Sequence, residues 1–310
     1  MLFDLLGDLA RKMRRPSAGG VSASAKQAAR VPAASIRHKY VWQRLSLPNE
    51  VHYDDSAAPR DEAIGLMSFE PRFALDVGCA SGSVARQVKA AFPQCRLWGV
   101  EPDERAAGLA RSRMDNVITG SLESIDWAAQ GVGAGEIDTV FLLDVLEHMY
   151  DPWLALATLR DLVSPRAQLV ISLPNVRNML LIRDLMNGYW RYRNMGLLDA
   201  THIRFFTEHE ALRLIYQTGF RVERRSFSQY GGTGSIYGQM QDQPFPQTIT
   251  FEKGSLVIGN LAELQSLAAS QLMFLVRLAS RDELGAGEIA LAEGEHPQTF
   301  AMGGDYPGVI

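Results

Sequence analysis

Apolar and polar positions alternate between two patterns along the chain from Phe73 onward. Short apolar runs of strand length are separated by segments whose apolar residues recur every three or four positions, as in amphipathic helices. This alternation predicts an α/β fold with a doubly wound, mostly parallel, seven-stranded Rossmann-like sheet. The predicted strands are FALDV (73–77), RLWGVE (96–101), NVITG (116–120), DTVFLL (138–143), QLVISL (168–173), FRVERRSF (220–227) and LMFLVRLA (272–279). The predicted helices are SVARQVKAAF (83–92), ERAAGLARSRM (104–114), PWLALATLRDLV (152–163) and EHEALRLIYQTG (208–219).

Residues that begin or end helices stand at three of the predicted boundaries. Asp151 is a helix N-cap, and Pro152 fits the first helical position, where its missing N–H loses no hydrogen bond. Thr207 and Glu210 have the spacing of a capping box, and Gly219 can end the same helix in a left-handed conformation. These signals strengthen the prediction of two of the helices.

The chain divides into three parts by composition. Residues 1–36 combine an amphipathic helix with a linker of small residues, 37–280 form the predicted domain, and 281–310 are an acidic tail that we expect to be disordered. Within the domain, the long connection at 175–206 predicts a lid over an acceptor. The insertion at 228–258 predicts a mobile flap over the acceptor pocket or a disordered segment.

The amphipathic segment at 2–15 ends in basic residues. Such a helix can lie on an anionic membrane surface. It can equally pack on its own domain or on a partner, since amphipathicity is common to both. We expect a cytoplasmic protein, with the inner membrane surface as an alternative place of contact.

The composition is that of a soluble globular protein, because 46% of the 310 residues are hydrophobic and 21% are charged. No apolar run reaches the roughly 18 residues that a transmembrane helix needs. Cys79 and Cys95 provide neither a disulfide framework nor a zinc-ligand spacing, which fits a reducing cytoplasm. The net charge of −4 combines a basic start with an acidic end, so we expect no nucleic-acid partner.

A glycine-rich turn, ALDVGCASG (74–82), joins the first predicted strand to the first helix. Ligands of such sheets bind beyond the carboxyl ends of the strands, and a carboxylate at the end of the second strand, Glu101, can accept hydrogen bonds from both hydroxyls of a ribose. The turn departs from the G-x-G-x-x-G pattern of dinucleotide sites. Asp76 precedes the first glycine, where it would repel a pyrophosphate. These features favour a ligand that has a cationic part and no phosphates.

Five segments carry a resemblance to a known family: LDVGCASG, GVEPD, VLEHMYDPW, VISLPNVRN and LLDATHIRFFT. Together they resemble the class I S-adenosylmethionine-dependent methyltransferases. The sequence is most similar to the branch associated with bacterial polysaccharide and glycosyltransferase pathways, and it resembles the ubiquinone-biosynthesis O-methyltransferases as well. The resemblance runs from about Tyr53 to Phe227 and implies an enzyme that uses S-adenosylmethionine.

The resemblance implies roles for individual residues. Asp76, Gly78 and Gly82 would form the cofactor loop, and Glu101 would hold the ribose. Ala80 stands where the family often has glycine. Ser121 stands where many relatives have an aspartate that binds the adenine amino group. The expected cofactor contacts are Asp76, Gly78, Cys79, Gly82, Glu101, Pro102, Ser121, Leu122 and Asp144.

Three polar residues follow the fourth strand, beside the place expected for the methyl group: Asp144, Glu147 and His148. His148 is the expected general base, because imidazole titrates near neutral pH, and His202 is the second candidate. Glu147 would orient the base or face the cofactor. The alternative role for Glu147 and His148 is to stabilise the loop and the helix start. Clusters of this kind also bind metals, but we expect none here, since the sequence shows no clear ligand set.

The predicted lid interleaves Tyr189, Trp190 and Tyr192 with Arg191 and Arg193. Aromatic faces stack on sugar rings, and arginine binds phosphate or carboxylate through two hydrogen bonds. The alternative is an amphipathic helix whose aromatic rings pack on the sheet. The expected acceptor contacts are Glu147, Asn175, Trp190 and Arg204.

The sequence therefore predicts an S-adenosylmethionine-dependent O-methyltransferase that acts on a saccharide, a glycoconjugate or another small molecule. One alternative is a quinone-like or other small aromatic acceptor. Another is a non-catalytic partner protein that keeps the fold. A third is a nicotinamide-dependent oxidoreductase, which would bind a dinucleotide.

Overall fold

The structure is a computed structural model of the 310-residue chain, and it describes residues 60–193, 195–229, 232–280 and 282–283. The predicted amphipathic segment at 1–36 lies outside the described residues, as does nearly all of the predicted tail at 281–310. Within the described part, no helix is both long enough and apolar enough to cross a membrane.

The main sheet has seven strands in the order β3-β2-β1-β4-β5-β9-β6. Neighbouring strands from β3 to β5 are parallel, and β9 is antiparallel to both β5 and β6. The strands of this sheet are β1 (Phe73–Val77), β2 (Arg96–Glu101), β3 (Asn116–Thr119), β4 (Ile137–Leu143), β5 (Val163–Pro174), β6 (Phe220–Ser228) and β9 (Gln271–Leu278). All seven were predicted, and the parallel, doubly wound arrangement is confirmed.

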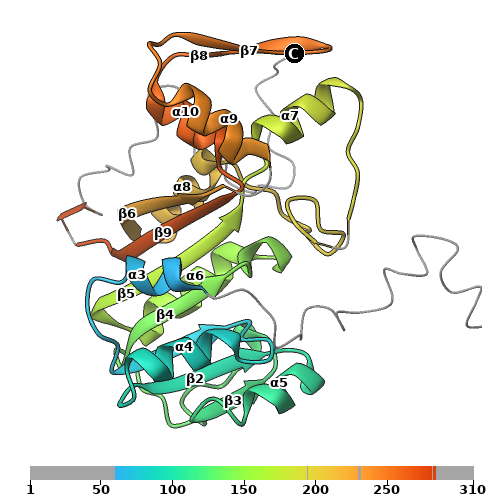
Figure 1. Ribbon diagram of the computed structural model, residues 1–310. Helices are drawn as coiled ribbons and strands as arrows, with labels where there is room; N and C mark the ends of the chain where they lie inside the picture. Colours follow the sequence, from blue (N-terminus) through green and yellow to red (C-terminus); the bar gives the residue numbers. More distant parts are fainter. Residues whose placement is uncertain (1–59, 194, 230–231, 281, 284–310) are drawn as a thin grey trace, which may run out of the picture. The chain divides into compact units, whose positions relative to one another are not determined.

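Helices cover both faces of this sheet (Figure 1). One apolar cluster joins the sheet to α6 (Pro152–Leu162) and α8 (Glu208–Gln217). A second cluster joins the opposite face to α3 (Asp61–Leu66), α4 (Ser83–Ala91) and α5 (Glu104–Ala110). Side chains of successive strand residues point to opposite faces, so the central strands β1, β4, β5 and β9 contribute to both clusters and are apolar along most of their length.

The helix ends follow the sequence signals closely. The Asp151 side chain accepts a hydrogen bond from the Leu154 N–H, and Pro152 occupies the first turn. Thr207 accepts from the Glu210 N–H at 3.3 Å. The second arm of the expected capping box is replaced, because the Glu210 carboxylate pairs with Arg213 at 3.2 Å.

The insertion at 228–258 forms regular structure and is not disordered where the structure describes it. It contains α9 (Gly232–Met240) and the antiparallel hairpin of β7 (Gln247–Phe251) and β8 (Gly254–Ile258), and α10 (Leu261–Ala268) follows it. These elements share a third apolar cluster with α7 (Met179–Met186), which belongs to the predicted lid. We call these five elements the cap; Figure 1 shows them together at one end of the sheet.

Chain direction explains why the cap and the glycine-rich turn meet at the same edge. The parallel strands β1, β2, β4 and β5 end at this edge, and so does β6. Because β9 runs the other way, its first residue, Gln271, pairs with the last residues of its neighbours, Pro174 and Ser228. The connection from β6 to β9 therefore leaves and re-enters the sheet at its carboxyl edge, where ligands of doubly wound sheets bind.

Candidate functional site

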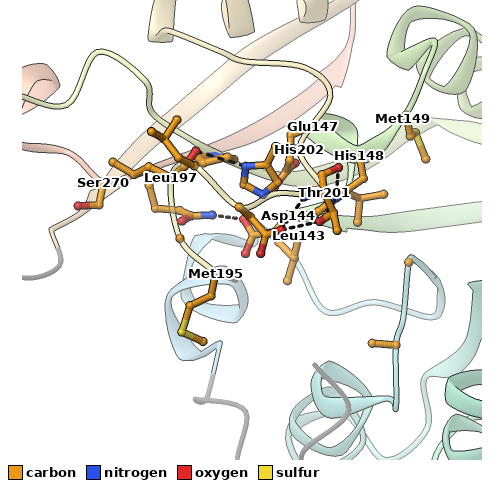
Figure 2. Close-up of a pocket in the computed structure, with 18 of the residues that line it drawn as sticks. Leu143, Asp144, Glu147, His148, Met149, Met195, Leu197, Thr201, His202 and Ser270 are labelled. Carbon is orange, nitrogen blue, oxygen red and sulfur yellow. Dashed lines mark hydrogen bonds and ion pairs between the residues drawn. The ribbon is translucent and has the colours of Figure 1, made fainter. Parts of the chain in front are cut away.

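A cavity of about 1530 Å³ lies at the carboxyl edge of the sheet. It is larger than the roughly 300–1,000 Å³ typical of a site for one small ligand, so it has room for two. The glycine-rich turn and the end of β2 line one part, and residues of the lid and the cap line the other. Figure 2 shows Asp144, Glu147, His148 and His202 among the residues that line the cavity.

The glycine-rich turn brings main chain close to the cavity. Gly78 has a φ of +67°, and a Cβ added there would lie 2.8 Å from Cγ2 of Val145. The N–H groups of Gly78 and Cys79 donate to the Val100 carbonyl and hold the turn against β2. Ala80 adopts a φ of +48°, a left-handed conformation that glycine takes without strain. The family's frequent glycine at this position thus matches the local backbone.

Asp76 is the last residue but one of β1 and is 3% exposed. Its Oδ2 has no hydrogen-bond partner among the described residues, although it lines the cavity. Burial, followed by repulsion from Glu101, raises the pKa of this carboxyl to about 8, against an opposing effect of Arg60. An unsatisfied buried carboxyl at a cavity fits a ligand that donates hydrogen bonds or carries positive charge.

Glu101 lies at the end of β2 and lines the same part of the cavity. Its two oxygens accept hydrogen bonds from the N–H groups of Ala80 and Asp103, each at 2.9 Å. Each oxygen keeps a further lone pair for a ligand, so both ribose hydroxyls can donate to it. Burial raises the pKa of Glu101, and the two N–H groups oppose that rise.

The cofactor contacts expected from the sequence are largely brought together. Gly82 is the exception, because it is absent from the cavity lining. It is the N-cap residue of α4, where a Cβ would lie 3.3 Å from Arg113, so its small size serves packing. The expected contacts that line the cavity are Asp76, Gly78, Cys79, Glu101, Pro102, Ser121, Leu122 and Asp144. These residues fit S-adenosylmethionine, because they supply a carboxylate for the ribose, a buried carboxyl oxygen without a partner among the described residues, and main chain at Gly78 that reaches the cavity without a side chain.

Asp144 stands between the two parts of the cavity with a φ of +60°, which is uncommon for a residue other than glycine. Its carboxylate pairs with Arg60 at 2.6 Å and accepts from Ser172 and Gln271. Sequence reasoning missed Arg60 and Gln271, which lie 84 and 127 positions away along the chain. No local motif marks such residues, since only the folded chain places them beside Asp144.

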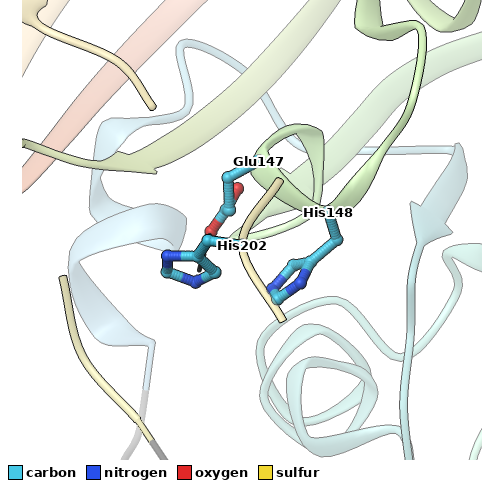
Figure 3. Close-up of side chains that lie close together, drawn as sticks. All are labelled: Glu147, His148 and His202. Carbon is cyan, nitrogen blue, oxygen red and sulfur yellow. Dashed lines mark ion pairs between the residues drawn. The ribbon is translucent and has the colours of Figure 1, made fainter. Parts of the chain in front are cut away.

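Glu147, His148 and His202 form a cluster on the acceptor side of Asp144 (Figure 3). Glu147 is completely buried, and neither of its carboxylate oxygens has a hydrogen-bond partner among the described residues. Its Oε1 is 3.9 Å from Nε2 of His202. Burial raises the pKa of Glu147 well above its usual range and lowers the pKa of His202, which His148 lowers further. Both shifts favour the neutral forms of the two groups.

Both histidines of this cluster have a defined ring orientation. Nδ1 of His148 lies 3.3 Å from the carbonyl oxygen of Thr201, and Nδ1 of His202 lies 3.3 Å from that of Leu197. A carbonyl oxygen only accepts, so each Nδ1 carries the proton and each Nε2 carries the lone pair. The Thr201 hydroxyl, which also contacts His148, is held in turn by Asp199 at 2.6 Å.

The lid residues reach the cavity differently from the prediction. Tyr189 and Arg191 line it, and the Arg191 guanidinium stacks on the Tyr189 ring at 3.8 Å. Trp190, the expected acceptor contact, does not line the cavity and packs instead against Phe205 at 5.3 Å. Neighbouring residues of an extended segment point in opposite directions, so only alternate side chains can face the ligand.

Two further expected acceptor contacts have structural roles. Asn175 is fully buried outside the cavity lining, where its amide donates to the carbonyls of Ser266 and Ala269 at the end of α10. Arg204 also lies outside the lining and donates to the Tyr150 carbonyl. Of the expected acceptor contacts, Glu147 alone lines the cavity.

The strand order, with one antiparallel strand beside β6, and the cavity at the carboxyl edge define the class I, S-adenosylmethionine-dependent methyltransferase fold. The profile of the family described as "Methyltransferase domain" matches residues 55–224, more than half of the chain. The chain therefore belongs to the methyltransferase-domain family.

Several curated proteins resemble the chain. One is an uncharacterized 37.1 kDa protein in transposon TN4556 of Streptomyces fradiae, 31% identical over 42% of this chain and 40% of that protein. A second is the ubiquinone biosynthesis O-methyltransferase of Aromatoleum aromaticum, 24% identical over 54% of this chain and 72% of that protein. A third is the trans-aconitate 2-methyltransferase of Methylobacterium radiotolerans, 24% identical over 39% and 46%. The chain thus spans less than half the length of two of these relatives.

Solved structures resemble the chain more distantly. A methyltransferase of Archaeoglobus fulgidus is 15% identical with a TM-score of 0.48, and it covers 70% of this chain and 90% of that one. The 1,6-didemethyltoxoflavin-N1-methyltransferase of Burkholderia thailandensis, solved with its acceptor and S-adenosylhomocysteine, is 17% identical with a TM-score of 0.45, over 86% and 94%. At such low identity these structures indicate nothing about the acceptor of this chain.

Proposed function

We propose that this chain is an S-adenosylmethionine-dependent O-methyltransferase whose acceptor is a saccharide or glycoconjugate. The observation that carries the proposal is a single cavity with two differently equipped parts. One part offers Asp76 and Glu101 to a nucleoside with a cationic tail, and the other offers histidines, an arginine and an aromatic ring. When bound, S-adenosylmethionine supplies a methyl group on a positively charged sulfur, which passes to the acceptor oxygen and leaves S-adenosylhomocysteine.

The residues of the chain position the reactants and handle the acceptor proton. Glu101 holds the ribose, and Asp76 offsets positive charge near the glycine-rich turn. Nε2 of His148 or of His202 has a lone pair, so either can accept the hydroxyl proton of an acceptor. Because methyl transfer requires an in-line approach, most of the catalytic effect comes from holding the oxygen in place.

The saccharide acceptor is supported by the lid. The Tyr189 ring is 46% exposed and lines the cavity beside Arg191 and Arg193. An exposed aromatic face stacks on the C–H face of a sugar, and the arginines suit a phosphate or carboxylate on the same molecule.

A quinone-like aromatic acceptor is the second candidate, favoured by the similarity to a ubiquinone biosynthesis O-methyltransferase. Incubating the chain with S-adenosylmethionine and two acceptor panels, phosphorylated sugars and catechols, separates the candidates by mass spectrometry. A methylated sugar supports the first proposal. Methylation confined to the catechols would overturn the saccharide acceptor and leave the methyltransferase in place.

Calorimetric titration with S-adenosylmethionine and S-adenosylhomocysteine tests the proposed binding of the cofactor. We expect both to bind the wild-type chain and Glu101→Ala to weaken them by roughly 10- to 100-fold, because a charged hydrogen-bond acceptor is lost. Glu104→Ala, an exposed carboxylate on α5, is the matched control and should bind as the wild type does. If the wild-type chain binds neither ligand, the proposed function is wrong.

A further inference from the structure

The cluster of Glu147, His148 and His202 contains three electron-pair donors at one wall of the cavity. One donor atom from each side chain lies within 4.8 Å of the others. Two imidazoles and one carboxylate are a donor set that suits divalent transition metals such as Zn²⁺, Mn²⁺ and Fe²⁺.

The buried carboxylate is the first observation that points to a cation. Glu147 is completely buried and turned toward His202 (Figure 3), yet its two oxygens have no donor among the described residues. Buried polar groups are satisfied in folded proteins, and each exception calls for an explanation. A cation bound between Glu147 and the histidines provides one, because it binds the carboxylate where no N–H or O–H does.

The hydrogen bonds behind the two rings are the second observation. Both Nδ1 atoms face backbone carbonyls, of Thr201 and Leu197, so both Nε2 atoms present lone pairs. Histidine ligands of metals nearly always have this arrangement, with the distal N–H given to a carbonyl or carboxylate that orients the ring. Asp199 extends it by holding the Thr201 hydroxyl that contacts His148.

The distances fit a site that closes on its ion. His202 Nε2 and Glu147 Oε1 are 3.9 Å apart. Ligand atoms of a tetrahedral site with bonds of about 2.1 Å lie roughly 3.4 Å apart, so closure needs movements of about an ångström. Glu147 and the exposed His148 are neighbours on a short helical turn (Leu146–His148), and His202 comes from the lid. Small side-chain movements are sufficient.

We propose that Glu147, His148 and His202 bind one divalent transition-metal cation beside the acceptor. Three protein ligands on one side leave positions open toward the cavity, where an acceptor oxygen can bind. A bound cation lowers the pKa of an oxygen ligand, so an acceptor hydroxyl bound to it can release its proton to water. With the cation bound, the two histidines serve as its ligands, and this replaces the general-base role given to either of them above. This inference rests on the proposed function for the identity of the acceptor oxygen, and it departs from the sequence-based expectation of no metal.

The test is a calorimetric titration of the chelator-treated, full-length chain with Zn²⁺, repeated with Co²⁺ to record the absorption of the bound ion. We expect one saturable site in the wild-type chain. Glu147→Gln, His148→Gln and His202→Gln should each weaken Zn²⁺ binding by about 100-fold, since each removes a ligand and loss of a supporting residue alone costs 10- to 100-fold. His209→Gln, an exposed histidine on α8, is the matched control and should bind Zn²⁺ as the wild type does.

S-adenosylhomocysteine binding to each variant shows whether the cofactor part is folded. If the variants of the two buried residues misfold, His148→Gln still tests the metal site, because His148 is exposed. Absence of a saturable Zn²⁺ site, or equal affinity in the wild type and all three cluster variants, overturns the metal site. If S-adenosylhomocysteine binds while Zn²⁺ does not, the metal site fails and the proposed function stands. If Zn²⁺ binds and S-adenosylhomocysteine does not, the proposed function fails and the metal site stands.

Discussion

Single methyl groups decide the geometry of the glycine-rich turn. A Cβ on Gly78 would meet Val145 at 2.8 Å in a left-handed backbone, whereas Ala80 already carries a Cβ in that conformation. We expect Gly78→Ala to lower the free energy of unfolding by about 1–3 kcal/mol, from backbone strain and the close contact together. Affinity for S-adenosylhomocysteine should fall as well, because the turn must move.

Ala80→Gly is the matched change in the opposite direction. Relief of the left-handed strain offsets the larger entropy of glycine in the unfolded chain, so we expect stability within about 1 kcal/mol of the wild type. Urea unfolding and calorimetry measure both variants. Equal losses of stability in Gly78→Ala and Ala80→Gly would show that the left-handed φ does not determine which substitution the turn tolerates.

The carboxyl of Asp76 makes stability depend on pH. Burial, then Glu101, raises its pKa to about 8. A carboxyl whose pKa is raised on folding contributes most to the free energy of unfolding below its unfolded pKa of about 3.9. This contribution is lost as the pH rises toward 8. We therefore expect Asp76→Asn to raise the melting temperature of the ligand-free chain more at pH 8 than at pH 5.

Asp161→Asn provides the control for this pH dependence, because Asp161 is exposed on α6. Its effect on the melting temperature should be the same at both pH values. An equal gain for Asp76→Asn at pH 5 and pH 8 would mean that Asp76 is ionised in the folded chain throughout this range.

At the scale of elements, Asn175 and Asn178 join the lid to the cap. The Asn175 amide donates to the carbonyls of Ser266 and Ala269, and the Asn178 amide also donates to Ala269 while its oxygen caps α7. The last carbonyls of a helix lack partners within the helix. These two side chains therefore satisfy the end of α10 and fix the cap at the edge of the cavity.

We expect Asn175→Ala to lower the free energy of unfolding by about 2–3 kcal/mol, since it removes two buried hydrogen bonds and leaves the Ala269 carbonyl with Asn178 as its side-chain donor. Asn187→Ala, at the half-buried end of α7, removes one hydrogen bond to Arg183 and should cost less than about 1 kcal/mol. Urea unfolding of both variants checks the difference. If Asn175→Ala keeps its stability but loses methyl transfer, Asn175 belongs to the acceptor site, as the sequence suggested.

The central strands of the main sheet were predictable because nearly all of their residues are buried. The strand at Phe73–Val77 is buried at every position, so it reads as an unbroken apolar run, and its predicted bounds match the structure. The cap was missed because its apolar residues pack on one another and on α7 rather than on the sheet. The capping signal of Asn260 and Glu263 at the start of α10 was nevertheless present in the sequence.

On the scale of the whole molecule, sequence reasoning located the two halves of the site but not the side chains that complete them. The site residues at the ends of β1, β2 and β4 could be predicted because a sequence motif coincides with the end of each strand. Arg60 and Gln271 reach Asp144 from distant segments, so tertiary structure alone reveals them. Asn175 and Arg204 are polar residues at the expected edge whose partners turned out to be backbone carbonyls.

The antiparallel course of β9 places methyl-donor binding and acceptor choice on different parts of the chain. Because both ends of the β6–β9 connection lie at the carboxyl edge, the residues between Ser228 and Gln271 can change in length and content while the strand pairing of the sheet stays as it is. The two carboxylates proposed to bind the methyl donor, Asp76 and Glu101, come from β1 and β2 and not from this connection. A chimera that exchanges it between relatives should thus inherit donor binding from the sheet and acceptor choice from the transplanted segment.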